Sequence, residues 1–430
     1  MARGRLLRPS VLHRQIANMR VFPRVRLECC VLIAIAWCAL VTFLFIQYGE
    51  DQVHSKTLQE TNKCPVCFGH TSCFMLHSSN MHVVKLTGLS KVSLFNYINV
   101  KNVFFGKYKG DEIVLKKLAH DSEFAEFDGR VCNGSARCTP RGRLFTRLLR
   151  GVFPDISDGR SESLALAAGV GDRFLREHLT CPSQRLMRRL FDALADESKE
   201  KFLHFATMLL INAEPLLLQA FPQSEGWPFP RYLGACGRLV MEQYVGPTLA
   251  NFRDAPWQQR VELALQLLEI ADMLTTNDSD FNLYMTDVTA DNLAVDADGR
   301  VHLVDVEDVV IVDRQQLEKD APADWNKTHV TPILCDDCMG YEADQLCGHH
   351  ISDHNYFAIC KGLLAPNAFG RGMSGGLLHS VPALVTSTHP ELERWLRLCA
   401  DPGPDGGSRF GPAAELRRTL NQVLEEASTE

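Results

Sequence analysis

The sequence has no surplus of positive charge, and its cysteines, although abundant, lack the density of a small disulfide scaffold. Its 45 Lys and Arg against 52 Asp and Glu give a net charge of -7, so no global positive field would attract nucleic acid. Fifteen cysteines in 430 residues are far too sparse for a small disulfide scaffold. With 46% hydrophobic residues, the chain can bury a large core. This excludes a disordered protein and suggests two or three domain-sized units.

Charge is also missing from residues 29–49, a long apolar run. About 20 apolar residues are enough to cross a bilayer as a helix, and no polar stripe marks this run as a buried core helix. Seven arginines precede it and Glu50 and Asp51 follow it, so the positive-inside rule places residues 1–28 in the cytosol. We expect an uncleaved type II signal-anchor, because a cleaved signal peptide would have a shorter charged region and small residues after the apolar run.

The cysteines beyond the apolar run agree with a lumenal compartment. They are even in number, which permits full pairing in an oxidising lumen, and three Asn-X-Ser/Thr triplets accompany them. We expect a glycoprotein of the endoplasmic reticulum or Golgi membrane, and the sequence leaves open whether a shed or secreted form is also released. The disulfide candidates are Cys64, Cys67, Cys73, Cys132, Cys138, Cys181, Cys236, Cys335, Cys338, Cys347, Cys360 and Cys399, and the glycosylation candidates are Asn133, Asn277 and Asn326.

Two of the cysteine pairs have the spacing of zinc ligands, namely Cys64-x2-Cys67 and Cys335-x2-Cys338. Together they allow a zinc-stapled membrane adaptor that binds no nucleotide. In an oxidising lumen, disulfides are the favoured fate of both pairs.

The lumenal part changes character along its length. Residues 50–81 form a polar, cysteine-containing stem, and residues 82–245 are rich in strand patterns, interrupted by a basic, partly helical insertion at about 120–200. Residues 246–430 are mostly helical. This order predicts an α+β protein of two unequal lobes that meet at about 243–247.

Two tight turns mark hairpins within these lobes. Lys109-Gly110-Asp111 separates two strand-like runs that cover residues 102–118. Asp298-Gly299 separates two further runs within residues 281–313. An amphipathic helix over 261–277 precedes the second hairpin.

The second hairpin carries the strongest chemical signal. Asp287 is followed five residues later by Asn292, and Asp305 comes thirteen residues after that. Phosphoryl transfer needs a carboxylate near the attacking hydroxyl, and an amide and a carboxylate on the metal ions that bridge the phosphates. Upstream, Lys116 ends a strand and can reach phosphates if a helix carboxylate such as Glu214 orients it.

These residues make the sequence resemble the protein kinase fold. IVLK (113–116) stands where that family has VAIK, MTDVTADN (285–292) where it has HRDLxxxN, and DVE (305–307) where it has DFG. More narrowly, the chain resembles the divergent protein kinase domain family of secretory-pathway proteins, in particular its deleted-in-autism branch. The shared-looking segments include NKCPVCFG (62–69), NVKNVFF (99–105), CPSQRL (181–186), EGWPFPRYLGACGR (225–238) and SGGLLH (374–379).

The resemblance implies a bilobal kinase-like fold with ATP and Mg²⁺ or Mn²⁺ as cofactors. It implies Lys116 and Glu214 as nucleotide-binding residues and Asp287 as the catalytic base. Asn292 and Asp305 would be the metal ligands. In addition, Asp353 resembles the helix aspartate that braces the catalytic loop from below.

Several departures from the kinase pattern bear on activity. Met285 and Thr286 replace the His-Arg pair, Glu307 replaces the DFG glycine, and no glycine-rich loop precedes Lys116. Pro215 suits the start of a helix better than its interior. Two functions therefore stay open: a lumenal phosphotransferase acting on hydroxyl groups of secreted or membrane proteins, and a pseudokinase that serves as a binding or signalling scaffold.

Overall fold

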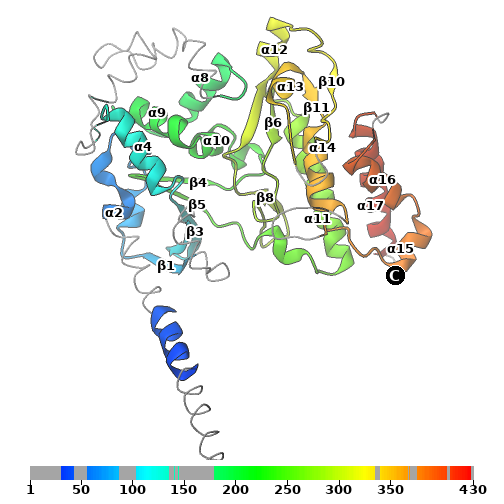
Figure 1. Cartoon of the computed structure of the whole chain (residues 1–430), viewed down its shortest axis with the longest axis horizontal. Helices are drawn as coiled ribbons and strands as arrows, with labels where there is room; N and C mark the ends of the chain where they lie inside the picture. The colour runs from blue at the N-terminus through cyan, green and yellow to red at the C-terminus, as the bar shows by residue number, and fades with distance from the viewer. Residues whose placement is uncertain are drawn as a thin grey trace, which may run out of the picture.

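The protein has the two lobes of a protein-kinase-like fold, a β-rich lobe on the left and a mostly helical lobe on the right of Figure 1. This computed structural model describes residues 31–42, 56–86, 103–134, 140, 144, 179–334, 339–366, 368, 375–403 and 407–427. Everything below refers to those residues.

The small lobe is built on a five-stranded antiparallel sheet in the order β1-β2-β3-β5-β4. The predicted first hairpin is β2 and β3, and Lys109 and Gly110 at its tip both have positive φ, as a type I′ turn requires. β3 ends with Lys116 opposite Val240 of β5. The strands are β1 (Met81–Leu86), β2 (Val103–Tyr108), β3 (Asp111–Lys116), β4 (Tyr232–Cys236) and β5 (Leu239–Gln243).

Helices fill the chain between β3 and β4. They are α4 (Asp121–Val131), α8 (Gln184–Ala193), α9 (Lys201–Ile211) and α10 (Glu214–Ala220). The first two lie in the predicted insertion, most of which is outside the described residues. The chain bends by 115° between α9 and α10. Pro215 lies in the first turn of α10, where its missing N–H costs no helical hydrogen bond.

The large lobe surrounds one central helix, α14 (His354–Ile359), which packs against α11 (Trp257–Thr275), α16 (Leu392–Ala400) and β6 (Phe281–Met285). β6 pairs with β9 (Val309–Asp313), and the predicted second hairpin joins β7 (Leu293–Val295) to β8 (Val301–Leu303). The remaining elements are α2 (Lys56–Gln59), η1 (Thr61–Lys63), α3 (Cys73–Leu76), η3 (Gln223–Glu225), η4 (Leu249–Phe252), α12 (Arg314–Asp320), β10 (Thr328–His329), α13 (Ala343–Gly348), β11 (Ile351–Ser352), the π-helix η5 (Cys360–Leu364), α15 (Ala383–Thr388) and α17 (Phe410–Ala427).

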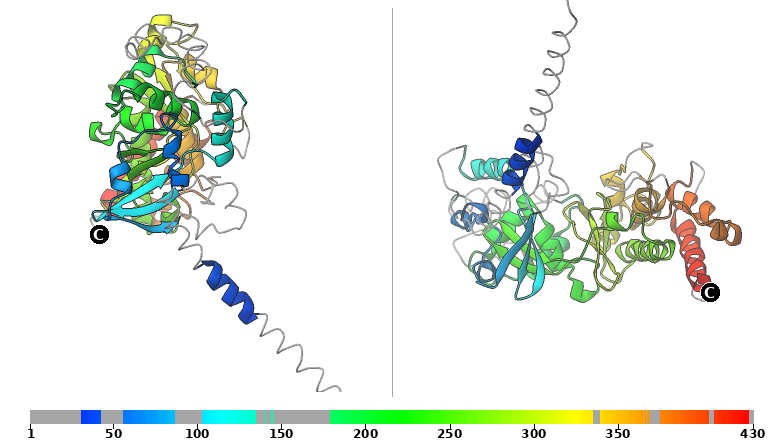
Figure 2. Two further views of the ribbon diagram at one scale, coloured as in Figure 1. Left: turned by 90° about the vertical axis from the view of Figure 1, so that its left-hand side faces the viewer. Right: turned by 90° about the horizontal axis from the view of Figure 1, so that it is seen from below.

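The predicted membrane anchor is only partly within the described residues. Val31–Thr42 forms an apolar helix that stands apart from both lobes in Figures 1 and 2. No single described helix is both long and apolar enough to cross a membrane; α9 and the helical stretch that begins at Glu214 meet that test only as a bent pair. The core cluster of the protein includes apolar side chains of both members of that pair. The signal-anchor therefore stays a prediction.

Disulfides connect parts of the chain that lie far apart. Cys64–Cys67, Cys73–Cys236, Cys181–Cys347 and Cys360–Cys399 are paired, and Cys132 is also disulfide-bonded. Cys138, Cys335 and Cys338 lie outside the described residues. Cys73–Cys236 fastens the stem to β4, and Cys181–Cys347 joins the start of α8 to the large lobe.

The glycosylation candidates differ in their surroundings. Asn133 and Asn326 are exposed. The Asn277 amide donates to the carbonyls of Met273 at 3.0 Å and Phe281 at 2.9 Å, so a glycan there would displace one of these bonds. All three sites stay predictions.

The linker between the lobes makes a close backbone contact that predicts the effect of a small substitution. A Cβ at Gly246 would lie 1.9 Å from the Val295 carbonyl oxygen, and neither backbone can move aside. We expect Gly246→Ala to lower the free energy of unfolding by about 1–3 kcal/mol, measured by urea unfolding. Gly411→Ala, in open space on α17, should instead raise it by up to about 1 kcal/mol. Equal effects of the two substitutions would contradict this prediction.

Candidate functional site

Lys116 ends β3 with its ammonium surrounded by acceptors. Its Nζ lies 2.8 Å from Glu214 Oε1 and 2.8 Å from Glu242 Oε2. It also donates to the Val304 carbonyl at 2.8 Å. Two of these contacts are hydrogen bonds, to Glu214 and to the Val304 carbonyl, and the contact with Glu242 is an ion pair. The structure thus forms the predicted Lys116–Glu214 pair across 98 positions.

Glu214 is held in place by its position at the start of α10. Its backbone N–H donates to Asn212 Oδ1 at 2.9 Å, and its Oε2 accepts from the Val306 N–H at 3.1 Å. The side chain is 2% exposed. A carboxylate in the first turn also interacts favourably with the helix dipole. Glu214 therefore connects Lys116 to the segment that stands in the place of DFG.

Glu242 is a member of this cluster that the sequence reading missed. It lies on β5 with its side chain 2% exposed, and its Oε1 is buried without a hydrogen-bond partner among the described residues. The available signal was an acidic residue in the strand LVMEQ, which is otherwise mostly apolar. The alternation of side chains along β5 does not by itself say whether Glu242 lies on the same face of the sheet as Lys116.

The charges in the cluster shift one another's titration. Burial by itself would lower the pKa of Lys116, but the carboxylates of Glu214, Glu242 and Asp305 outweigh it and raise that pKa. Burial raises the pKa of Glu214 well above its ordinary value; the charge of Lys116 opposes this rise, and Glu242 and Asp305 add to it. Lys116 is therefore positive at neutral pH, within an excess of negative charge.

The other predicted residues share one hollow beside this cluster. The Asn292 amide donates to Asp287 Oδ2 at 3.1 Å and to the Asp287 carbonyl at 3.0 Å. The hollow is small, and every residue that lines it belongs to the large lobe. Its lining consists of Met285, Thr286, Asp287, Asn292, Leu303, Asp305, Asp308 and Val309.

Glu307, in the place of the DFG glycine, is fastened to the small lobe. Its carboxylate accepts a short hydrogen bond from the Asn212 amide, which also donates to the Leu118 carbonyl at 3.1 Å. The bond from Val306 to Glu214 holds the same segment. The DVE segment is thus attached to the residues that precede and begin α10.

The catalytic loop is braced from α14, although not by the residue we predicted. Asn355 Oδ1 accepts from the Met285 N–H at 2.9 Å, and His354 Nε2 lies 3.0 Å from the Met285 carbonyl. The Asp353 carboxylate instead accepts from Thr331 N–H at 2.8 Å and from the Arg409 N–H and guanidinium at 3.0 Å. The prediction for Asp353 was wrong because this residue caps α14 and faces another segment.

Comparison with known proteins gives the same assignment as the fold. A family model described as the protein-kinase domain of FAM69 matches residues 206–402. The chain is 37% identical to divergent protein kinase domain 2A of Xenopus tropicalis over 414 residues, covering 89% of this chain and 92% of that protein. It is 37% identical to the 2A protein of Homo sapiens over 402 residues, covering 88% and 91% of the two chains. Identity to divergent protein kinase domain 2B of Bos taurus is 28% over 393 residues, covering 86% and 84%.

The buried brace at His354 predicts a loss of stability in acid. Burial lowers the pKa of His354 to about 4, although its bond to Met285 acts in the opposite direction. The unfolded chain binds this proton near pH 6.5, so stability falls as the pH drops from about 6.5 to about 4. The difference between the two pKa values corresponds to about 3 kcal/mol.

We expect His354→Gln, which keeps an N–H donor for Met285, to remove about 3 kcal/mol of this pH dependence. The measurement is the free energy of unfolding at pH 7 and pH 4 for wild type and variant. His82→Gln, on an exposed strand residue, serves as the control and should leave the dependence unchanged. An unaltered pH dependence in His354→Gln would show that the brace is not a buried neutral imidazole.

Proposed function

Because the chain belongs to the divergent protein kinase domain family, we propose that it is a phosphotransferase of the secretory pathway that modifies hydroxyl groups of secreted or membrane proteins. The observation that carries this proposal is the ion pair between Lys116 and Glu214, formed beside the hollow that Asp287, Asn292 and Asp305 line. The side chains that phosphoryl transfer needs are thus in one place.

The residues present fit a nucleotide with Mg²⁺ or Mn²⁺. The amide oxygen of Asn292 and the carboxylate of Asp305 are oxygen ligands of the kind these ions prefer, and the ions would neutralise charge on the transferred phosphoryl group. Asp287, held by the Asn292 amide, would accept the proton of the substrate hydroxyl. Lys116, oriented by Glu214, would position the phosphates.

We further propose that residues 29–49 contact the membrane of the endoplasmic reticulum or Golgi as a type II anchor, with the two lobes in the lumen. The arginine-rich segment before this run supports the orientation. The paired cysteines support an oxidising compartment. Substrates or partners would then be proteins of the secretory pathway.

The resting cleft is closed to nucleotide by its own side chains. Lys116 Nζ is already engaged by Glu214, Glu242 and the Val304 carbonyl, each at 2.8 Å, and Glu242 places a negative charge beside it. Asp287, Asp305 and Asp308 line the hollow, so a triphosphate needs divalent ions to offset the repulsion by their carboxylates. Entry therefore requires the release of Lys116 from Glu242.

The ion cluster around Lys116 also favours a second function, that of a pseudokinase scaffold. In that case the ion cluster would be a structural element that holds the lobes together, and Glu307 would fix the DVE segment permanently to Asn212. Nucleotide binding distinguishes the two functions.

The first test is the thermal stability of the purified chain with ATP and Mg²⁺ or Mn²⁺. A ligand that binds only the folded state raises Tm as its concentration increases. At a ligand concentration of one hundred times Kd, the free energy of unfolding increases by about 2.7 kcal/mol. Asp305→Ala should lose this shift, whereas Asp278→Ala on the surface should keep it. Asp287→Asn should keep the shift and lose ATP turnover. Turnover that persists in Asp305→Ala would remove the proposed site.

The second test removes the charge of Glu242. We expect Glu242→Gln to bind ATP with Mg²⁺ roughly tenfold more tightly than wild type, because a hydrogen bond to a charged group contributes about 1.5 kcal/mol or more. Glu112→Gln, at an exposed position of β3, is the matched control and should bind like wild type. If neither wild type nor Glu242→Gln binds nucleotide with either ion, the phosphotransferase proposal is wrong and the scaffold remains.

A further inference from the structure

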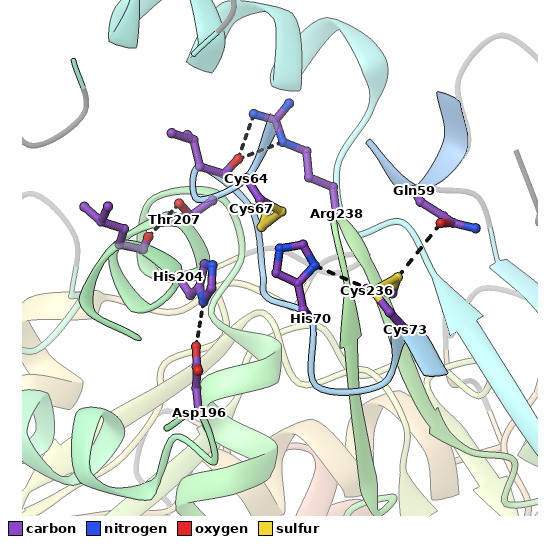
Figure 3. Close-up of a disulfide and its surroundings, with 12 residues drawn as sticks. Gln59, Cys64, Cys67, His70, Cys73, Asp196, His204, Thr207, Cys236 and Arg238 are labelled. Carbon is purple, nitrogen blue, oxygen red and sulfur yellow. Dashed lines mark hydrogen bonds and ion pairs between the residues drawn. A yellow bond between two sulfur atoms is a disulfide. The ribbon is translucent and has the colours of Figure 1, made fainter. Parts of the chain in front are cut away.

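A second cluster of reactive side chains lies outside the nucleotide cleft. The ligand atoms of Cys64, Cys67 and His70 all lie within 4.8 Å of one another, with Cys64 and Cys67 joined as a disulfide. His70 Nδ1 lies 3.7 Å from Cys73 Sγ, and Figure 3 shows the other ring nitrogen turned toward the Cys64–Cys67 disulfide. Cys64 is half-buried and His70 is exposed, so the cluster is reachable from solvent.

A fourth side chain beside this cluster has an unused ligand atom. His204 on α9 is 1% exposed, its Nδ1 lies 2.6 Å from Asp196 Oδ2, and its Nε2 is buried without a partner among the described residues. A carboxylate on one imidazole nitrogen orients the other nitrogen, which is the common arrangement behind metal-binding histidines. The His204 ring centroid is 6.1 Å from that of His70, at 79° to it.

These positions suit a tetrahedral ion of the zinc type. Two imidazoles on one Zn²⁺, with Zn–N of about 2.0–2.1 Å, have ring centroids roughly 5 Å apart, about one ångström less than His70 and His204 show. Two thiolates at about 2.3 Å from the ion lie just under 4 Å from each other. Opening the disulfide and a small shift of side chains would satisfy both conditions. Two thiolates and two imidazoles form a common zinc donor set.

The loop that carries the cysteines is anchored independently of their disulfide. The buried Arg238 guanidinium donates to the Val66 carbonyl at 3.1 and 3.2 Å. Phe68 N–H donates to the Gly237 carbonyl at 2.8 Å, and Gly237 N–H donates to the Gly69 carbonyl at 2.8 Å. The ligands would therefore stay close together after reduction.

The Cys64–Cys67 disulfide itself adds little chain constraint. It closes a separation of 3 residues, against 163 for Cys73–Cys236. In the chain-entropy account, the stabilisation by a disulfide grows with the length of the loop that it closes. Stability alone thus gives a weak reason for this pair beside two histidines.

We propose that Cys64, Cys67, His70 and His204 form a redox-gated Zn²⁺ site. A dithiol reductant would transfer two electrons and two protons to the Cys64–Cys67 disulfide, becoming a disulfide itself. Zn²⁺ would then replace the two thiol protons, which are released to solvent. The oxidised chain excludes the ion and the reduced chain binds one. The proposal does not rest on the proposed phosphotransfer.

The test uses the full chain, reduced with a phosphine without oxygen and titrated with Co²⁺ as a spectroscopic probe. We expect one Co²⁺ per chain, with thiolate-to-cobalt charge-transfer absorption that Zn²⁺ abolishes. Cys64→Ser with Cys67→Ser should weaken binding more than a hundredfold, whereas Cys181→Ser with Cys347→Ser should not change it. Asp196→Asn should weaken binding by about 10–100-fold and keep the absorption.

The proposal is overturned if the reduced wild type, folded by circular dichroism, shows no thiolate-to-cobalt absorption, or if the absorption survives in the Cys64→Ser and Cys67→Ser double variant. A second measurement covers the case in which full reduction unfolds the chain. With limiting reductant, Zn²⁺ should protect Cys64 and Cys67 from alkylation relative to Cys181 and Cys347, as read by mass spectrometry of peptides. Equal alkylation of both pairs with and without Zn²⁺ would also overturn it.

Discussion

The buried ammonium of Lys116 joins segments that lie up to 188 positions apart in sequence. It binds carboxylates from α10 and β5 and the carbonyl of Val304, directly before the DVE segment of the large lobe. Breaking a buried charge pair by removing one partner costs about 3–5 kcal/mol, because the remaining charge is left uncompensated. The contact therefore has a structural role whether or not the protein transfers phosphate, and any nucleotide must compete with it.

The position of Glu214 depends on contacts well outside the cleft. α10 packs against α8, and the chain leading into α8 is joined to the large lobe by the Cys181–Cys347 disulfide. Ser183 and Arg185 both donate to the Asp313 carboxylate at the end of β9. The insertion is thus joined covalently to the large lobe, and α10 packs against it. If the two lobes move apart, the Cys181–Cys347 disulfide keeps the insertion attached to the large lobe during that movement.

Much of the site was predictable because its residues lie in local motifs whose spacing carries the chemistry. The turns at Lys109-Gly110 and Asp298-Gly299 predicted both hairpins, and the second hairpin brings Asn292 and Asp305 together. Lys116 lies on the first hairpin and reaches Val304 only through a contact between the lobes. Contacts between distant elements were not predictable in the same way. The contact of Glu242 with Lys116 depends on the pairing register of β5 with β3. Asn355 braces the loop in place of Asp353 because each position along a helix points its side chain in another direction. Disulfide partners depend on the assembled fold, since the spacing of cysteines allows many pairings.

The central claim is that Lys116 is shared between Glu214 and Glu242 and must leave Glu242 to bind a phosphate. An experimental structure of the chain with a non-hydrolysable ATP analogue and Mn²⁺ tests it most directly. The account predicts Lys116 Nζ on a phosphate oxygen with Glu214 still bound and Glu242 released. A nucleotide bound in the cleft while Lys116 keeps its contact with Glu242 would contradict it.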